Sequence, residues 1–196
     1  MIPILILAAG QSSRMRGRDK LLEDVGGEPL LRRHVRQALG LGGKVFVALA
    51  PGQDARVAAI DDLPATVLEI PEAREGMSGT LRGAVARLPE CRAFMVVLAD
   101  LVAIETQDLS AVHDAYEANP DYLIWRGATV DGRPGHPIIF AAKLRPEFSE
   151  LSGDGGGETL VNPLRSRTIL VTLDGDRTRL DLDTPEEWAA WRNASR

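Results

Sequence analysis

A cluster of cations near the N-terminus is the feature of this 196-residue chain that first suggests chemistry. The segment "LAAGQSSRMRGRDKLL", residues 7–22, places Arg14 and Lys20 after a turn of small residues. Small residues let backbone N–H groups approach a ligand, and arginine and lysine side chains donate hydrogen bonds to phosphate oxygens. The pattern therefore favours a polyphosphate site, with an ordinary solvated basic loop as the alternative.

Aspartates that follow two other segments are candidate ligands for the metal ion that a polyphosphate needs. Asp100 comes directly after the apolar run "AFMVVLA" and is expected at the edge of a sheet where ligands bind. The motif "LDLDTPEEW" alternates apolar and acidic residues, which predicts Asp181 and Asp183 on one face of a short strand. Mg²⁺ is held by one or two carboxylates together with phosphate oxygens. The alternative for Asp100 and Asp183 is capping of the turn or helix that follows.

Strands and helices are predicted to alternate along most of the chain. Continuous apolar runs predict buried strands at residues 2–7, 44–50, 66–70 and 93–99. Shorter strands are predicted at residues 122–125, 137–140 and 168–173, and helices at 29–39, 54–63, 106–119 and 184–191 and from "GMSGT" to Leu88. This order predicts an α/β fold, a three-layer sandwich with a mostly parallel sheet. We expect one domain over residues 1–196, with an antiparallel excursion or insertion at about 127–163.

The composition limits the classes of partner. A net charge of −5 argues against general nucleic-acid binding, and the single Cys91 excludes an internal disulfide and fits a reducing compartment. No apolar run approaches the roughly 20 residues of a membrane helix. The start "MIPILILAAG" has no positive charge before its short apolar run, so a buried strand is expected rather than a signal peptide. We therefore expect a cytoplasmic protein with no membrane partner.

Several common catalytic motifs are absent from the sequence. The first loop fits neither G-x-x-x-x-G-K-[ST] nor G-x-G-x-x-G, and no histidine or cysteine cluster has zinc spacing. The motif G-x-S-x-G is also absent, which argues against a covalent route through a serine.

Residues 7–22 resemble the signature of the MobA-like nucleotidyltransferases, L-A-(A/G)-G-x-S-x-R-M-G-x-x-K-x-L. Ala9 and the following "KLLEDVGGEPLL" are more similar to the molybdenum cofactor cytidylyltransferase branch than to the guanylyltransferase branch. The resemblance implies a Rossmann-like fold of the nucleotide-diphospho-sugar transferase type. It also implies a catalytic role in neutralising the triphosphate for Arg14 and Lys20, and nucleotide contacts from Leu7, Ala8, Ala9, Gly10, Ser12 and Ser13. Arg16 departs from the family glycine, and because Gly17 follows we expect a local shift of one residue.

Two further segments carry the resemblance on the nucleotide side. "LDLDTPEEW" is similar to the family's D-I-D-T-P-E, which implies that Asp183 completes a Mg²⁺ site with the catalytic Asp100. The family's Asp-Gln-Pro or Asp-Met-Pro is here Asp100-Leu101-Val102, so the proline that stiffens the turn is missing. "GMSGT" resembles the stretch that covers the base, which implies nucleotide contacts from Ser78, Gly79 and Thr80, although Ser78 or Thr80 could serve only as a helix cap.

Two glycine-containing segments resemble the acceptor side of the family. "DGRPGHPIIF" is similar to G-x-x-G-(H/N)-P, which implies acceptor contacts from Gly135 and His136, with a structural histidine as the alternative. "LSGDGGGETLV" is similar to L-x-G-D-x-G-(A/G)-R-x-L, which implies a contact from Asp154. Glu158 replaces the family arginine in this motif, and Arg165 or Arg167 could supply the missing charge.

The resemblance implies transfer of a nucleotidyl group, preferably CMP from CTP, to a phosphorylated acceptor such as molybdopterin, with release of pyrophosphate. A molybdoenzyme is a further possible partner. The substitution at Glu158 favours an alternative, a cytidylyl- or sugar-nucleotide transferase with another acceptor. A second alternative is a non-catalytic nucleotide-binding or cofactor-delivery module, against which the presence of both Asp100 and Asp183 argues.

Overall fold

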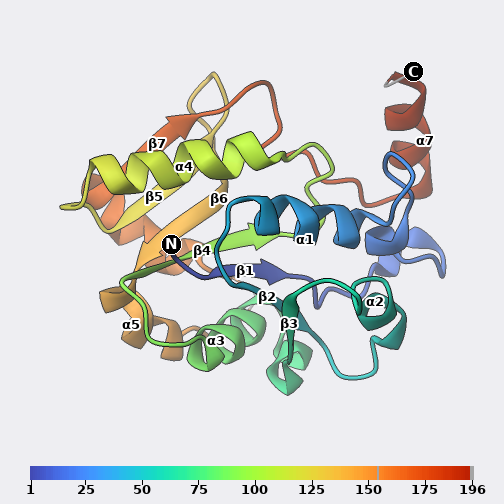
Figure 1. The fold of residues 1–196 in the computed structure, drawn as a ribbon, viewed down its shortest axis with the longest axis horizontal. Coiled ribbons are helices and arrows are strands. Elements are labelled where there is room, and N and C mark those ends of the chain that lie inside the picture. Colours follow the sequence, from blue (N-terminus) through green and yellow to red (C-terminus); the bar gives the residue numbers. More distant parts are fainter. Residues whose placement is uncertain (154, 195–196) are drawn as a thin grey trace.

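The computed structural model describes residues 1–153 and 155–194, and within them a single seven-stranded sheet runs through the molecule (Figure 1). The strand order is β3-β2-β1-β4-β6-β5-β7, and β6 is antiparallel to both of its neighbours. All other neighbouring strands are parallel, which confirms the predicted mostly parallel sheet. The strands are β1 (Ile4–Leu7), β2 (Val45–Leu49), β3 (Ala65–Glu69), β4 (Ala93–Leu98), β5 (Ile124–Ala128), β6 (Pro134–Ala141) and β7 (Thr168–Thr172).

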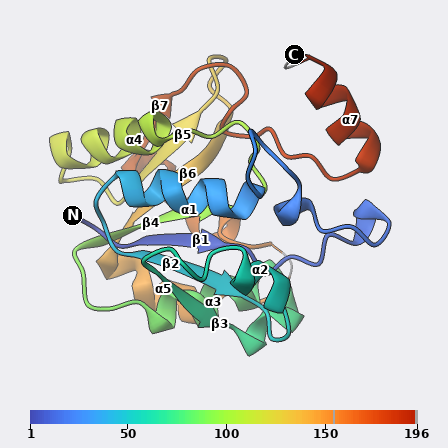
Figure 2. The ribbon, with the colours of Figure 1, turned by 45° about the vertical axis from the view of Figure 1, so that its right-hand side comes forward.

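Helices cover both faces of the sheet, which confirms the predicted three-layer sandwich. α1 (Leu30–Gly40) and α4 (Thr106–Ala118) lie on one face, and α3 (Met77–Arg87) and α5 (Arg145–Ser149) lie on the other (Figures 1 and 2). The remaining helices are α2 (Asp54–Ala58), α6 (Glu158–Val161) and α7 (Pro185–Ala194), with short 3₁₀ helices η1 (Ser13–Met15), η2 (Lys20–Leu22), η3 (Pro71–Glu75), η4 (Ala142–Leu144) and η5 (Asn162–Arg167). In the part of the chain described, none of these helices combines the length and apolar character needed to cross a bilayer.

Some element bounds differ from the sequence prediction. α2 ends at Ala58 instead of residue 63, because Ile60 turns into the core and the carboxylate of Asp62 is held by Arg32 of α1 at 2.8 Å. β5 begins at Ile124 instead of residue 122 and continues through Arg126 to Ala128. β6 extends beyond the predicted residues 137–140 at both ends and includes His136. The short helices α5 and α6 were not predicted.

The central strands fix the position at which the sheet can bind a ligand. β1 is buried on both faces, and Ile4, Leu5 and Ile6 have no exposed surface. It pairs with β2 on one side and with β4 on the other. The strands after β1 are therefore added first on one side, as β2 and β3, and then on the other side, as β4, so the strand order reverses at β1. Open α/β sheets bind ligands outside the carboxyl ends of the strands at such a reversal. Here that point carries the loop after β1 and Asp100 after β4.

α3 lies unusually close to η3, because two glycines of α3 face it. A Cβ atom at Gly79 would lie 2.1 Å from the carbonyl oxygen of Glu72. A Cβ atom at Gly83 would lie 2.8 Å from Ile70 Cγ2. The absence of side chains at these positions therefore sets where the N-terminal end of α3 lies.

We predict that Gly79→Ala lowers the free energy of unfolding by about 1–3 kcal/mol, because the added methyl forces α3 away from η3. Urea denaturation followed by circular dichroism measures this change. Gly10→Ala is the matched control, since a Cβ atom at Gly10 would meet no atom within 4 Å. Equal stability of the two variants would contradict the packing role of Gly79.

Candidate active site

A cleft of about 390 Å³ opens at the carboxyl ends of β1 and β4. The loop after β1 forms one wall, and the start of α3 forms another. Most of the nucleotide-side residues singled out in the sequence line it: Leu7, Ala8, Ala9, Gly10, Ser12, Ser13, Arg14, Lys20, Thr80, Asp100 and Asp183. Gln11, Arg74 and Met77 also line the cleft and were not predicted. The fold thus gathers residues from both ends of the chain around one polar space.

The loop after β1 adopts a backbone conformation that side chains rarely take. Ser12 and Arg16 both have φ of 51°, in the left-handed region, and Gly17 follows with φ of 84°. Arg16 stands where the resembling signature has glycine, and its left-handed backbone explains why glycine suits that position. Strain of this kind costs about 1–3 kcal/mol per residue and persists only where the surroundings enforce it.

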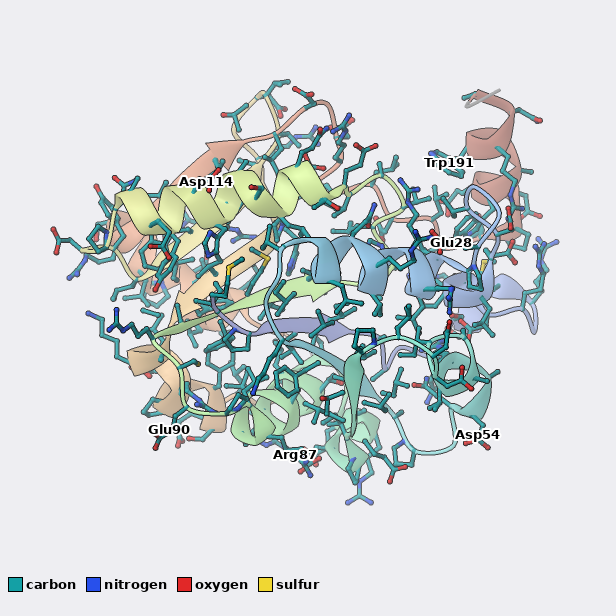
Figure 3. All side chains as sticks on the ribbon, in the orientation of Figure 1. Glu28, Asp54, Arg87, Glu90, Asp114 and Trp191 are labelled. Carbon is teal, nitrogen blue, oxygen red and sulfur yellow. The ribbon has the colours of Figure 1, made fainter. Side chains whose placement is uncertain are left out.

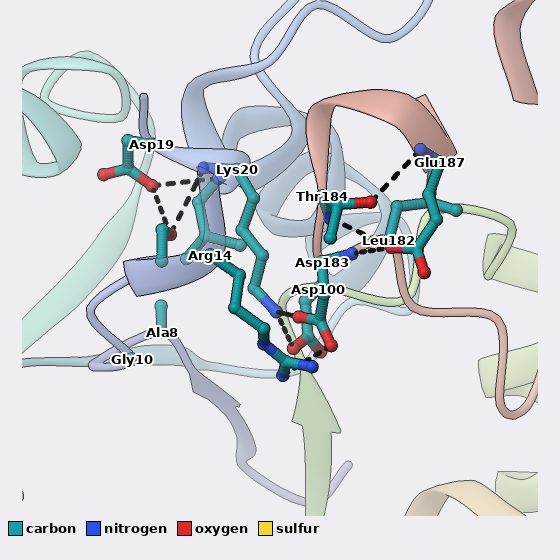
Figure 4. A network of polar contacts seen from close by, with 12 residues as sticks. Ala8, Gly10, Arg14, Asp19, Lys20, Asp100, Leu182, Asp183, Thr184 and Glu187 are labelled. Atoms are coloured by element: carbon teal, nitrogen blue, oxygen red, sulfur yellow. Dashed lines mark hydrogen bonds and ion pairs between the residues drawn. The ribbon is translucent and has the colours of Figure 1, made fainter. Parts of the chain in front are cut away.

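An ion pair between the buried Arg56 and the partly exposed Asp19 holds the loop in this conformation. Arg56 of α2 is buried, and its Nε and Nη2 donate to the two carboxylate oxygens of Asp19 at 2.7 and 2.9 Å. Its Nη1 donates to the carbonyl oxygen of Ala8. The hydroxyl of Ser12 donates to Asp19 at 3.2 Å and accepts from the backbone N–H of Lys20 at 3.2 Å (Figure 4). Sequence analysis missed Arg56 and Asp19, although they hold the cleft wall in shape.

Two separate contacts bring Asp100 and Asp183 together. After β4, Leu101 forms a β-bridge with Asp181, and the N–H of Val102 donates to the carbonyl oxygen of Leu180 at 3.1 Å. The position of the missing family proline therefore carries a hydrogen bond that proline cannot make. This bridge lays the segment before Asp183 alongside the turn after Asp100.

The first turn of α7 fixes the backbone of Asp183. Glu187 accepts hydrogen bonds from the N–H groups of Asp183 and Thr184 at 2.8 and 2.9 Å (Figure 4). The hydroxyl of Thr184 in turn accepts from the N–H of Glu187, which makes a capping box at the predicted helix start. The indole of the buried Trp188 donates to the carbonyl oxygen of Leu182 at 3.1 Å, so α7 is tied to the site on two sides.

The ammonium of Lys20 lies between the two aspartates (Figure 4). Lys20 Nζ is 2.6 Å from Asp100 Oδ2 and 2.8 Å from Asp183 Oδ1, and Arg14 Nη2 is 2.6 Å from Asp183 Oδ2. Burial lowers the pKa of Lys20, but the attraction of Asp100 and then Asp183 outweighs it, so the pKa is raised overall. Lys20 is therefore charged, and two cations balance two acids.

The two aspartates have the chemistry of a divalent-cation site. Both carboxylates point at one position, which here holds the Lys20 ammonium, and their side chains are 27% and 17% exposed. Carboxylate oxygens are the ligands that Mg²⁺ and Mn²⁺ prefer. No larger group of histidine, cysteine, aspartate or glutamate suited to a metal occurs in residues 1–153 and 155–194. A divalent ion would thus use these two acids and complete its coordination with ligand oxygens and water.

The other residues predicted on the nucleotide side do not line the cleft. The hydroxyl of Ser78 donates to the carbonyl oxygen of Ser152 at 3.3 Å and accepts from the N–H of Gly156 at 3.2 Å. Gly79 packs on η3. The N-cap of α3 is Gly76, so the alternative of a cap by Ser78 or Thr80 is wrong. Nucleotide contacts from Ser78 and Gly79 remain predictions, and the structure gives both residues a packing role.

The predicted acceptor residues lie on β6. Gly135 is buried against Thr178, where a Cβ atom would lie 2.4 Å from the carbonyl oxygen of Thr178. His136 Nδ1 lies 3.4 Å from the carbonyl oxygen of Val96, which can only accept, so the ring donates through Nδ1. Burial lowers the pKa of His136 to about 4, and the imidazole is neutral at pH 7. It can therefore bring no positive charge to an acceptor phosphate. Asp154 lies outside the described residues.

The cation nearest to Glu158 is not one that the sequence suggested. Arg165 donates to Asn162 at 3.0 Å, and Arg167 donates to the carbonyl oxygen of Asp121 at 2.7 Å. Neither pairs with Glu158, and a compensating charge from one of them remains a prediction. Arg126 of β5 instead donates to Glu158 Oε1 at 3.0 Å.

Comparison with known proteins supports a nucleotide site. The family model of the MobA-like NTP transferase domain matches residues 4–168. A molybdenum cofactor guanylyltransferase of Burkholderia vietnamiensis is 29% identical over 193 residues, covering 95% of this chain and 93% of that protein. The bifunctional protein GlmU of Alkalilimnicola ehrlichii is 32% identical over 113 residues, which are 57% of this chain but only 24% of GlmU. This chain thus spans about a quarter of GlmU.

Solved structures share the whole fold. The crystal structure of Rv0371c from Mycobacterium tuberculosis is 26% identical, with a TM-score of 0.83 and coverage of 98% of this chain and 97% of that one. A complex of the same protein with manganese gives a TM-score of 0.78 at 26% identity, with 96% of each chain covered. The family model and these shared folds together confirm the predicted nucleotidyltransferase type of α/β sandwich.

We predict that Lys20→Gln lowers the free energy of unfolding by about 1–3 kcal/mol, because it removes the cation between two adjacent carboxylates and leaves only Arg14 paired with Asp183. Manganese chloride should then stabilise the variant more than the wild type, since the ion can take the vacated position. Urea denaturation with and without Mn²⁺ measures both effects, and Lys143→Gln on the exposed surface is the control. Unchanged stability of Lys20→Gln would contradict the bridging role.

Proposed function

Since the chain belongs to the MobA-like NTP transferase family, we propose that it transfers a nucleotidyl group from CTP to a phosphorylated acceptor and releases pyrophosphate. The observation that carries this proposal is the cleft in which Arg14 and Lys20 meet Asp100 and Asp183. A triphosphate needs cations for its oxygens and acids for its metal ion, and these four side chains supply both.

The loop after β1 would hold the triphosphate. The loop begins with small residues, which leave its backbone N–H groups accessible. The ion pair of Arg56 and Asp19 sets the shape of the loop before any ligand binds. Arg14 is 70% exposed and is therefore free to turn from Asp183 towards a phosphate oxygen. The Lys20 ammonium could likewise move from the two aspartates to a phosphate oxygen, over a shorter distance than the Arg14 guanidinium. Catalysis then rests on positioning and on neutralising the charge of the leaving pyrophosphate.

Asp100 and Asp183 would hold Mg²⁺ or Mn²⁺. When bound, such an ion neutralises phosphate oxygens and makes the α-phosphorus more electrophilic. The manganese complex of Rv0371c supports a divalent ion in this fold and leaves the choice of ion open.

The acceptor would lie on the side of β6. A phosphate monoester is largely ionised at neutral pH, so it can attack the α-phosphorus without a protein nucleophile. The neutral His136 would contribute shape and a hydrogen-bond acceptor at Nε2 rather than charge. Molybdopterin is our proposed acceptor, because the full-length relative is a molybdenum cofactor guanylyltransferase. A cytoplasmic location and a molybdoenzyme partner remain predictions.

The identity of the nucleotide base is the most specific part of the proposal. Ala9 lines the cleft, and its resemblance to the cytidylyltransferase branch of the family favours CTP. The guanylyltransferase relative favours GTP as the second candidate.

The proposal is tested by measuring pyrophosphate release with each of the four NTPs, Mg²⁺ and molybdopterin. We expect release with CTP to exceed release with GTP. Greater release with GTP than with CTP would show that guanine is the preferred base, and the proposed nucleotidyl transfer would stand. Release with none of the four, together with measurable nucleotide binding, would indicate a non-catalytic module. If pyrophosphate is released from CTP only when another phosphorylated acceptor replaces molybdopterin, the assignment of molybdopterin as the acceptor is wrong.

We predict that Asp100→Asn lowers turnover by about 10²–10³-fold or more, because it removes one charged oxygen ligand at the developing charge. Asp114→Asn on the outer surface of α4 is the control for loss of one acid (Figure 3). Steady-state kinetics and circular dichroism measure activity and fold. Turnover of Asp100→Asn equal to that of Asp114→Asn would remove the metal assignment.

A further inference from the structure

We propose that Arg126 is a binding residue for an anionic group of the acceptor, a phosphate monoester or a carboxylate, and that Glu158 occupies this position until the acceptor displaces it. The assignment of the anion to the acceptor rests on the proposed function. The anion site itself rests on the structure of β5, β6 and α6 alone.

The sheet register places Arg126 on the same face as Val96 of β4, the strand that leads to Asp100. Ile138 of β6 is opposite Val96 of β4 and opposite Arg126 of β5. Opposite residues of paired strands point to the same face, and so do residues two apart along one strand. Arg126, Ile138 and Val96 therefore share a face, and Val96 lies four residues before Asp100 of the cleft. His136 lies next to this row, with its Nδ1 3.4 Å from the carbonyl oxygen of Val96. The carbonyl oxygen of Gly135, the residue before His136, accepts from Arg126 Nε at 3.2 Å, so Arg126 contacts this part of β6 directly.

Arg126 is a buried cation with an exposed counter-ion. Its side chain is 4% exposed, whereas that of Glu158 is 58% exposed. The guanidinium donates through Nε to the carbonyl oxygen of Gly135 at 3.2 Å and through Nη2 to Glu158 at 3.0 Å. A buried charge needs a partner, so Arg126 retains a strong demand for an anion. Glu158 can instead be solvated in water, which makes it the replaceable member of the pair.

The position of α6 connects this pair to the cleft. The N–H of Gly156 is anchored on Ser78 at the start of α3, and a Cβ atom at Gly156 would lie 3.0 Å from Met77 Cγ. Met77 itself lines the cleft. Gly156, two residues before Glu158, therefore packs against a residue of the cleft wall, which links the Arg126–Glu158 pair to the nucleotide cleft.

The chemistry of the exchange defines the ligand class. A phosphate or carboxylate can accept from the guanidinium as Glu158 does, often through two oxygens. The acceptor anion would enter as the Glu158 carboxylate turns out to solvent, with no covalent step and no change in protonation. The motif position that carries arginine in the resembling family carries an acid here, and β5 supplies the cation in its place.

Inorganic phosphate is the probe for the site. Isothermal titration calorimetry would compare the wild type, Glu158→Gln and the double variant Glu158→Gln/Arg126→Met. Binding at Arg14 and Lys20 is common to all three, so differences between them report the Arg126 site. We expect Glu158→Gln to bind phosphate about tenfold more tightly or with one additional site, and the double variant to lose this gain. Glu147→Gln, an exposed acid of α5, controls for net charge.

Equal phosphate binding by Glu158→Gln and Glu147→Gln would overturn the anion site. The role in the reaction has a separate readout, because Glu158→Gln should lower KM for the anionic acceptor and leave KM for the nucleotide unchanged. A gain in phosphate binding without a change in the acceptor KM would keep the anion site and overturn its assignment to the acceptor. A protein without any turnover would refute the proposed function and leave the calorimetric result valid.

Discussion

The contact of one lysine with two aspartates is the interaction on which the rest of the site depends. Lys20 Nζ meets Asp100 and Asp183, which are 80 and 163 positions away in the chain. Two carboxylates this close repel each other unless a cation lies between them. The same geometry that suits an ammonium also suits a divalent ion, and the same cations that balance the acids suit a triphosphate. Binding of a metal-bound nucleotide can therefore exchange partners within the site without leaving any charge unpaired.

The surrounding elements hold the side chains of Lys20, Asp100 and Asp183 in position. Arg56 and Asp19 lock the loop that carries Lys20, and the bridge between Leu101 and Asp181 lays the two acidic segments side by side. α7 completes the arrangement, since its capping box fixes Asp183. It also contacts the loop after β1 through ion pairs of Arg16 with Glu186 and of Arg192 with Glu23 (Figures 1 and 2). The C-terminal helix is thus part of the site's framework.

Sequence patterns predicted the parts of the molecule that local chemistry determines. Continuous apolar runs located β1 and β4, and because parallel strands end at one edge, they also located the loop with Lys20 and Asp100. Arg56 and Arg126 were beyond reach, because a lone arginine within a helix or strand looks solvent-exposed until its partner 37 or 32 positions away is known. Ser78 and Gly79 were interpreted from a motif, whereas their environment depends on η3 and on the loop before α6. Buried polar contacts between distant segments leave no periodic signal.

The central claim is that one cleft holds both the nucleotide triphosphate and its metal ion. A crystal structure with CTP and Mn²⁺, with manganese located by anomalous scattering, tests it most directly. The account predicts manganese bound by Asp100 and Asp183 and the Lys20 ammonium moved from these acids to a phosphate oxygen. Nucleotide bound outside the cleft, or manganese away from both aspartates with the Lys20 contacts intact, would contradict it.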